Sequence, residues 1–280
     1  MTRSGAAAGL LVLVVSFVAC SSTAPAQPAA AGPSPTRGAA TAAPEPEGAG
    51  PELLIPIPTA PPAQPPMSAR YSTALVADHC VDRDLAAPPV GDRALVVLDR
   101  SYALTPDDVP PDLVEASTAG LDGASGTRLV RQIVVADLGD LRAAWQAAGL
   151  TIIVESAYRS FADQAATFDG WAARIGHDGA LLRAARPGHS EHQLGTAIDV
   201  TSPGWSGRFG DWAVEAVEGA WMAVHAWEHG FVMSYPADGQ HDTCFGYEPW
   251  HYRWIGREAA AEHRHSGLTL RRFLERYVTS

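Results

Sequence analysis

The segment GHSEHQLGTAIDV, residues 188–200, decides both the fold and the site of this chain. Its first half is polar and rich in side chains that can bind a metal, whereas its second half is apolar and typical of a strand. Asp199 falls within that strand, where a buried carboxylate without a partner would be very costly. His192 lies upstream and can meet Asp199 if the chain bends at Gly195. We therefore expect the two side chains to share a partner, for which a divalent metal ion is one candidate.

A second cluster, EPWHYRW at residues 248–254, offers the remaining groups that such a site needs. His251 could be a third ligand, giving two histidines and one carboxylate with water in the open position, as in catalytic zinc sites. Glu248 precedes it by three residues and is placed to act as general base toward a water whose pKa zinc lowers to about 7. The alternative is a buried Asp–His network with a surface glutamate, and spacing alone does not decide between the two.

Apolar patterns around these clusters predict a mixed domain. Short β-branched or aromatic runs indicate strands at residues 94–98, 151–154, 196–200, 231–235 and 250–254. Helices are expected between these runs and at the C-terminal end, over residues 257–265 and 270–278. Because strands and helices do not alternate regularly, we predict an α+β domain with a central antiparallel sheet flanked by helices.

Three of the expected helices have clear end signals. Asp137 is expected to cap one that Gly149 ends, and Ser160 is expected to open another that Gly176 ends. A third runs from about residue 211 to 229. Its apolar spacing predicts that four side chains face the core, namely Val214, Val217, Trp221 and Val224.

The N-terminus has the composition of an export signal followed by a spacer. One arginine precedes about 14 apolar residues, which are too few to span a bilayer comfortably. The signal ends at residue 20 in FVAC, which resembles a bacterial lipoprotein cleavage box with Cys20 as the lipidated residue; the alternative is ordinary cleavage near Ala19. Residues 21–69 hold 13 of the 22 prolines and predict an extended tether. Residues 70–280 then form one folded domain, which we expect a lipid anchor and the tether to hold some distance from a membrane.

The cysteines and the net charge indicate a disulfide bond and exclude one class of partner. Outside the cytoplasm, Cys80 and Cys244 favour a disulfide over the alternative of two buried thiols. The formal net charge of −11 argues against nucleic acid as a partner.

Two patterns, SxHxxGxAxD from Ser190 and ExWH from Glu248, resemble the zinc-dependent D-alanyl-D-alanine carboxypeptidases of the VanY type. These belong to a wider group that includes lysostaphin and sonic hedgehog. The segment SAYRS at residues 156–160 and the stretch 221–236 agree with the resemblance. It covers roughly residues 90–265 and implies a hedgehog/DD-peptidase-like domain. It also implies three zinc ligands, His192, Asp199 and His251, with Glu248 as catalytic base.

The resemblance also implies a substrate and residues that contact it. Arg159, at a strand-to-helix turn, can stabilise a developing oxyanion or pair with a substrate carboxylate. Gln164 and Ser190 are expected to contact the substrate beside it. The expected reaction is removal of the terminal D-alanine from peptidoglycan stem peptides by a monomeric enzyme. The alternatives are an L,D-carboxypeptidase, a stem-peptide endopeptidase, or a non-catalytic wall-binding lipoprotein.

A second histidine motif points to a different class of metallopeptidase. The string HAWEH at residues 225–229 matches the H-x-x-E-H pattern of inverzincins, in which two histidines one helical turn apart bind zinc. That pattern is weak without a further carboxylate ligand, and the helix in which it falls is expected to pack against the domain. We therefore disfavour it.

Overall fold

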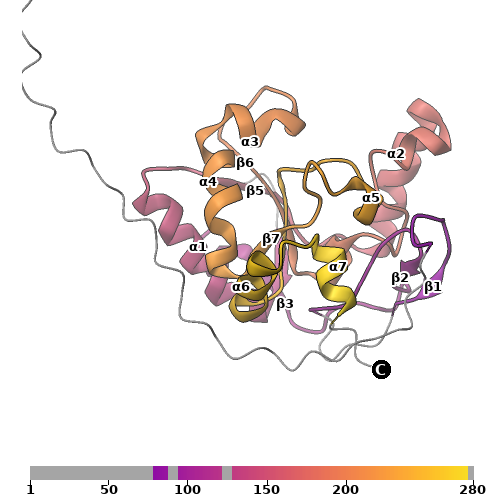
Figure 1. The fold of residues 1–280 in the computed structure, drawn as a ribbon, viewed down its shortest axis with the longest axis horizontal. Helices are drawn as coiled ribbons and strands as arrows, with labels where there is room; N and C mark the ends of the chain where they lie inside the picture. Colours follow the sequence, from indigo (N-terminus) through magenta and orange to yellow (C-terminus); the bar gives the residue numbers. More distant parts are fainter. Residues whose placement is uncertain (1–77, 88–93, 122–127, 277–280) are drawn as a thin grey trace, which may run out of the picture. The chain divides into compact units, whose positions relative to one another are not determined.

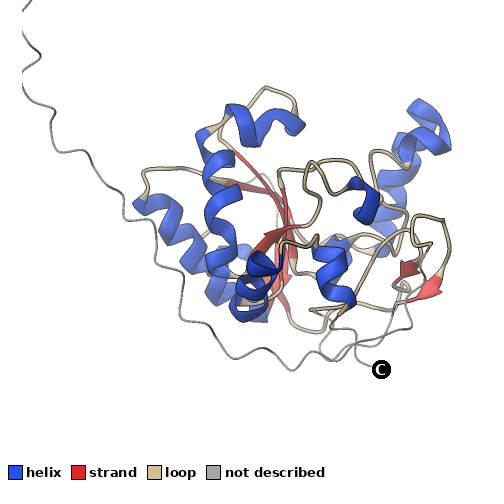
Figure 2. Cartoon of the chain, viewed as in Figure 1, coloured by secondary structure: helices blue, strands red, loops and turns tan. Residues whose placement is uncertain are grey.

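A four-stranded antiparallel sheet forms the centre of the computed structural model, which describes residues 78–87, 94–121 and 128–276. In order across the sheet, its strands are β5 (Ile153–Ser156), β6 (Ala197–Thr201), β8 (His251–Trp254) and β7 (Phe231–Met233). All three pairings are antiparallel. Helices surround this sheet in Figure 2, so the predicted α+β class is confirmed.

The helices approach the sheet from several sides. In the view of Figure 1, α1 (Val135–Ala147) and α4 (Val217–His225) lie to the left of the sheet, and α2 (Phe161–Ala180) and α5 (Gln240–Thr243) lie to its right. Helices α6 (Arg257–Ser266) and α7 (Leu270–Glu275) lie near its lower end. The smaller elements are the parallel pair β1 (Leu85–Ala86) and β2 (Tyr102–Ala103), the antiparallel pair β3 (Leu113–Glu115) and β4 (Leu129–Arg131), the short helix α3 (Trp212–Glu215), and the 3₁₀ helices η1 (Ala116–Ala119), η2 (Gln132–Val134), η3 (Glu191–Leu194), η4 (Phe209–Asp211) and η5 (Ala226–His229).

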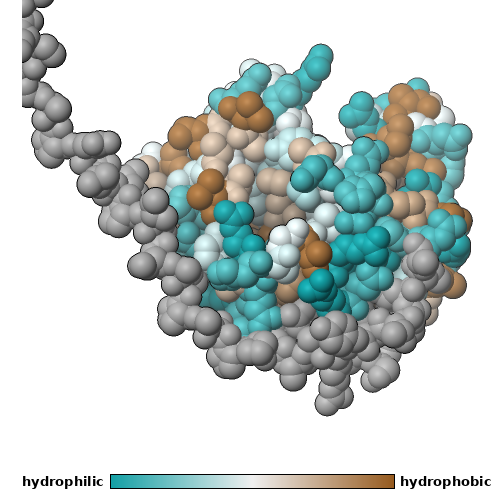
Figure 3. Space-filling model, viewed as in Figure 1, coloured by the Kyte–Doolittle hydropathy of each residue, from teal (hydrophilic) through white to brown (hydrophobic). Residues whose placement is uncertain are grey.

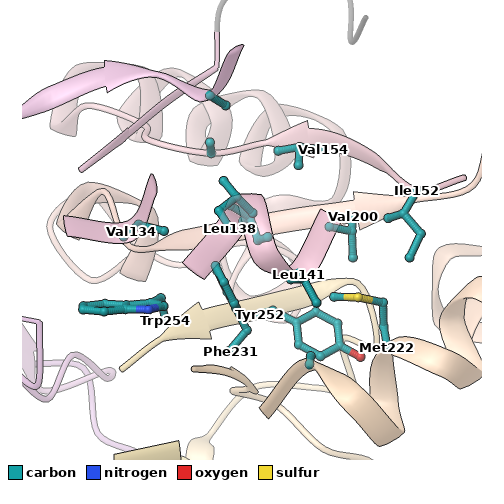
Figure 4. Close-up of a cluster of buried hydrophobic side chains, with 14 of the residues drawn as sticks. Val134, Leu138, Leu141, Ile152, Val154, Val200, Met222, Phe231, Tyr252 and Trp254 are labelled. Carbon is teal, nitrogen blue, oxygen red and sulfur yellow. The ribbon is translucent and has the colours of Figure 1, made fainter. Parts of the chain in front are cut away.

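The alternation of side chains along the central strands separates the apolar core from the site. Val200 of β6 and Tyr252 of β8 are buried in one cluster with Leu138 of α1, and Figure 4 shows all three side chains in this cluster. Neighbouring residues of a strand point to opposite faces of the sheet. Asp199 and His251 therefore lie on the face that turns away from this core.

Helix α2 begins where the sequence predicts. The Ser160 hydroxyl accepts a hydrogen bond from the Asp163 backbone N–H at 3.1 Å, which caps the first turn. Gly176 has a φ of 77° and interrupts the helical backbone, although helical hydrogen bonding resumes and the helix ends only at Ala180. Gly176, which was expected to end the helix, therefore kinks it instead.

The expected strand over residues 94–98 is wrong. This segment is buried, with Val96 only 1% exposed, but it pairs with no strand of the central sheet and belongs to neither of the two-stranded pairs β1–β2 and β3–β4. Its carbonyl oxygens at Ala94 and Val96 instead accept hydrogen bonds from the Arg253 guanidinium at 2.8 and 2.7 Å. An apolar β-branched run predicts burial, and here a side chain satisfies the backbone that a neighbouring strand would otherwise have paired.

The expected helix over residues 211–229 is also wrong as a single element. Ala216 has extended dihedral angles and separates α3 from α4, and η5 follows α4 with tighter turns. The break changes which face is buried: Met222 is fully buried, whereas Val214 is 80% exposed and Val217 is 64% exposed. In Figure 3, apolar residues are visible on the surface at the upper left, over α3 and α4. Val224 is exposed as well, and Trp221 is only partly buried.

Asp137 does not cap α1, because the helix already begins at Val135 after a 3₁₀ turn. Its carboxylate instead accepts hydrogen bonds from the Trp254 indole N–H at 2.8 Å and from the Arg257 guanidinium. The residue therefore ties α1 to the end of β8 and the start of α6.

Cys80 and Cys244 form a disulfide, with their Cα atoms 5.3 Å apart. This bond joins the segment before β1 to the end of α5. Residues 1–77 lie outside the described residues, and with them the expected signal (1–20), Cys20, the tether (21–69) and the first residues of the domain. Within the described part of the chain, none of the helices has the length and apolar character needed to cross a membrane.

Candidate active site

The register of β6 and β8 places Asp199 directly opposite His251. Asp199 Oδ1 lies 3.0 Å from His251 Nδ1, and Asp199 Oδ2 lies 3.1 Å from His192 Nε2. His192 belongs to η3, which ends at Gly195 with a φ of 70° before the chain enters β6. This left-handed turn is the bend that brings His192 back to Asp199. One ligand atom from each of the three side chains lies within 4.8 Å of the others.

Hydrogen bonds on the far side of each ring fix which nitrogen faces the centre. His192 Nδ1 lies 2.6 Å from the Ala157 carbonyl oxygen, which can only accept, so Nδ1 donates and Nε2 faces Asp199. His251 Nε2 donates in the same way to Glu191 Oε2 at 2.9 Å, which turns Nδ1 toward Asp199. Two imidazole nitrogens and one carboxylate are the donor set of a catalytic zinc site, so these residues fit that metal.

The two histidines keep the carboxylate of Asp199 ionised. Burial would raise the pKa of Asp199, but the two histidines outweigh it and hold this pKa well below its ordinary value. Burial lowers the pKa of His192. Burial would also lower the pKa of His251, yet its hydrogen bonds to Asp199 and Glu191 raise that pKa to about 10. The aspartate is therefore ionised at neutral pH, and its negative charge lies between the two imidazoles.

Glu248 lies on the wall of the same site. Its backbone N–H donates to the Tyr235 carbonyl at 3.0 Å, and its carbonyl accepts from the His251 N–H at 3.1 Å, so a turn sets its distance from the histidine. Part of the residue is exposed, but its carboxyl group is surrounded by protein. Burial, together with the negative charges of Asp199 and Glu191, raises the pKa of Glu248 to about 7. A carboxylate with such a pKa is suited to take up and release a proton near neutral pH.

Arg159 lies between β5 and α2, where the sequence predicts a strand-to-helix turn. Its guanidinium donates to Gln164 Oε1 at 2.8 Å and to Ser156 Oγ at 3.0 Å, and it lies 3.8 Å from Asp199 Oδ2. Gln164 is itself held by a hydrogen bond from Nε2 to the Ala185 carbonyl at 2.7 Å. The orientation of Arg159 is therefore set by fixed neighbours on the same side of the site.

One cavity of about 190 Å³ brings the expected site residues together. Its lining includes all seven side chains that the sequence singled out for the chemistry: Arg159, Gln164, Ser190, His192, Asp199, Glu248 and His251. The other lining residues include Trp171, Arg183, Tyr235, Phe245 and Trp250. A glutamate isolated on the surface, which was the open alternative for Glu248, is not what the structure shows.

Sequence reasoning missed the carboxylate of Glu191. This side chain is 5% exposed, accepts hydrogen bonds from His251 and from the Ser234 hydroxyl, and forms an ion pair with Arg253 at 2.8 Å. The signal was available, because an arginine in the middle of a predicted strand requires a buried anion. The anion cannot be identified from spacing, since Glu191 and Arg253 are 62 residues apart.

The alternative histidine motif does not form a metal site. His225 Nδ1 lies 3.1 Å from Glu228, and both side chains are partly exposed. Among the described residues, these groups and His229 are not gathered into a set of converging ligand atoms.

Known proteins are similar to this chain in sequence and in fold. Residues 127–257 match the family model VanY, described as D-alanyl-D-alanine carboxypeptidase. The chain is 30% identical over 183 residues to the Bacillus subtilis (strain 168) protein named "Putative carboxypeptidase YodJ", an overlap of 65% of this chain and 67% of YodJ.

Solved structures of two peptidases are similar to this chain in fold. The LdcB LD-carboxypeptidase aligns with a TM-score of 0.60 and 26% identity over 72% of this chain and 97% of LdcB. The zinc complex of a mutant of the vancomycin-resistance D,D-pentapeptidase VanY aligns with a TM-score of 0.54 and 29% identity over 65% of this chain and 98% of VanY. The expected hedgehog/DD-peptidase-like fold is confirmed. The matched segment spans every residue of the site described above, and the chain belongs to the VanY family of D-alanyl-D-alanine carboxypeptidases.

Proposed function

We propose that this protein is a zinc-dependent carboxypeptidase that removes the C-terminal D-alanine from peptidoglycan stem peptides. The observation that carries this proposal is the convergence of His192, Asp199 and His251 in one cavity with Glu248. The activity named for the matching family and the zinc in the VanY structure support it. The three converging side chains would hold the metal, which when bound supplies a Lewis acid for peptide hydrolysis.

The remaining residues of the cavity have distinct tasks in this reaction. Glu248, with its pKa near 7, accepts a proton from the attacking water and passes it to the departing amine. Arg159 donates hydrogen bonds to the carbonyl oxygen as negative charge develops on it, or to the carboxylate at the end of the peptide. Gln164 holds the guanidinium of Arg159 in place, and Ser190 presents its hydroxyl to the peptide at the cavity wall.

A second candidate is an L,D-carboxypeptidase, because the alignment with the LdcB LD-carboxypeptidase has a higher TM-score than that with VanY. The same catalytic groups serve either bond, since both reactions hydrolyse the peptide bond to a terminal D-alanine, which follows a D-residue in the first case and an L-residue in the second. Mass spectrometry of purified stem peptides distinguishes the candidates. Loss of one alanine from the pentapeptide supports the first, loss from the tetrapeptide supports the second, and release of a larger fragment supports an endopeptidase. Binding without any cleavage would support a non-catalytic wall-binding lipoprotein.

We further propose that the protein is exported and anchored to the membrane through Cys20, with residues 21–69 as a spacer that lets a monomeric domain reach the wall. The apolar signal and the proline content of the spacer support this arrangement. Incorporation of labelled fatty acid into the wild-type protein, and its loss in Cys20→Ser, is the expected result. Equal membrane association of the two proteins would contradict the anchor. Light scattering of the purified protein tests the monomer.

A further inference from the structure

Glu191 is a buried carboxylate directly behind the proposed metal site. It is not among the residues that line the 190 Å³ cavity, so it is not placed to touch a substrate there. Its Oε2 accepts the hydrogen bond of His251 Nε2 at 2.9 Å, and the Ser234 hydroxyl donates to the same oxygen. Its direct contact with the proposed metal ligands is therefore the hydrogen bond to His251.

The position of Glu191 is fixed from its other side. Its Oε1 accepts a hydrogen bond from Arg253 Nη1 at 2.8 Å, and Arg253 is fully buried in the middle of β8. The second guanidinium nitrogen, Nη2, donates to the backbone carbonyls of Ala94 and Val96. The carboxylate is thus held between a histidine and an arginine that cannot swing out to solvent.

The two proposed histidine ligands are supported unequally. The far nitrogen of His192 donates to a neutral backbone carbonyl, whereas that of His251 donates to an ionised carboxylate. A hydrogen bond to an ionised acceptor is stronger than one to a neutral acceptor, and such partners fix the ring and increase the basicity of the opposite nitrogen.

We propose that Glu191 is a positioning residue that orients the His251 ring and strengthens Nδ1 as a metal ligand, so that it sets the zinc affinity of the site. This inference rests on the proposed function, because it takes His251 to be a zinc ligand. It adds a residue within the SxH motif that acts from behind the metal, with Arg253 as its anchor.

The test is the zinc affinity of Glu191→Gln, measured on the purified full chain by competition with a chromogenic chelator. The amide keeps the shape of the side chain but loses the charge. We expect zinc to bind about 10- to 100-fold more weakly, the range typical for loss of an outer hydrogen-bond partner of a metal ligand. An affinity within about twofold of wild type would overturn the proposal.

Asp99→Asn is the matched control, because Asp99 forms another buried ion pair, with Arg271 at 2.9 Å. The chemical change is the same, but Asp99 does not contact a proposed ligand side chain. Both variants should unfold at lower urea concentration than wild type, and only Glu191→Gln should lose zinc affinity. Equal weakening in both variants would mean a general loss of stability and would overturn the proposal.

A second variant covers the case in which Glu191→Gln does not fold. Glu191→Gln with Arg253→Met removes both buried charges together, which proteins tolerate better than the loss of one partner. Weak zinc binding in this folded double variant supports the proposal, and wild-type binding overturns it. His192→Ala distinguishes failure of the proposed function from failure of the role of Glu191. If His192→Ala keeps full zinc affinity, the proposed function fails. If zinc affinity falls in His192→Ala but not in Glu191→Gln, the proposed function stands and the role of Glu191 is rejected.

Discussion

Asp199 of β6 and His251 of β8 are partners across an antiparallel strand pair, with Oδ1 of the first 3.0 Å from Nδ1 of the second. Their neighbours Val200 and Tyr252 face the apolar core instead. A slip of the register by one residue would exchange these faces and bury the site side chains in the core. The packing that stabilises the sheet is therefore also what sets the geometry of the site.

His192→Ala should abolish tight zinc binding, because it removes one of three proposed protein ligands. The loss of affinity should exceed the roughly 100-fold that an outer hydrogen-bond partner can cost. His225→Ala is the control, since this histidine belongs to the alternative motif and pairs with Glu228 near the surface. Zinc content after dialysis should be one ion per chain for the control and none for His192→Ala. The opposite ranking would assign the metal to the other motif.

Arg159→Lys should lower kcat by roughly 10- to 100-fold, with zinc content unchanged. Lysine keeps the charge but cannot donate through a planar fork that Gln164 and Ser156 orient. Steady-state kinetics on a pentapeptide, with kcat and KM separated, measure the effect. Arg257→Lys, in a surface pair with Asp137 and Asp140, should leave both constants unchanged. A normal kcat in Arg159→Lys would exclude Arg159 from the reaction.

Replacing both Cys80 and Cys244 by serine should lower the free energy of unfolding by about 2–5 kcal/mol, because the open chain gains entropy when it unfolds. Zinc affinity should stay the same, since the proposed ligands lie on the sheet and on η3. Urea unfolding of oxidised wild type and of the double variant measures the difference. Identical unfolding midpoints and slopes would show that the bond contributes nothing.

His263 should make stability depend on pH below neutrality. Burial lowers the pKa of its imidazole to about 4, and its ring packs edge-on against Phe273 at 5.3 Å. Since this pKa is lower than in the unfolded chain, stability is complete above about pH 6.5 and falls as the pH drops toward 4, by up to about 3 kcal/mol. Urea unfolding at pH 7 and 4.5 should show a smaller difference for His263→Phe than for wild type. Equal differences for the two proteins would show that His263 does not cause the pH dependence of stability.

The sequence predicts the proposed site better than it predicts the elements around it. Ligand-type residues next to an apolar strand constrain their own placement, because a buried Asp199 needs partners of a particular kind. The run at residues 94–98 carries no such constraint: its composition predicts burial, but its partner, Arg253, lies far along the chain. For the same reason Glu191 could not be recognised as the support of His251.

The expected helix at residues 211–229 failed for a different reason. Valine spacing predicts one continuous apolar face, but the extended backbone at Ala216 divides the segment and leaves Val214, Val217 and Val224 exposed. No glycine or proline marks this break. The two short helices pack closely around it, since a Cβ on Gly219 would come within 2.3 Å of the Trp212 carbonyl oxygen.

In the proposed reaction, Glu248 moves the proton for hydrolysis at a zinc held by the three converging side chains. The most direct measurement is release of D-alanine from a purified pentapeptide by wild type and by Glu248→Gln, each first shown to contain one zinc per chain. We predict cleavage by wild type and a rate at least about 100-fold lower for Glu248→Gln. Equal rates for the two zinc-loaded proteins would show that Glu248 does not move this proton.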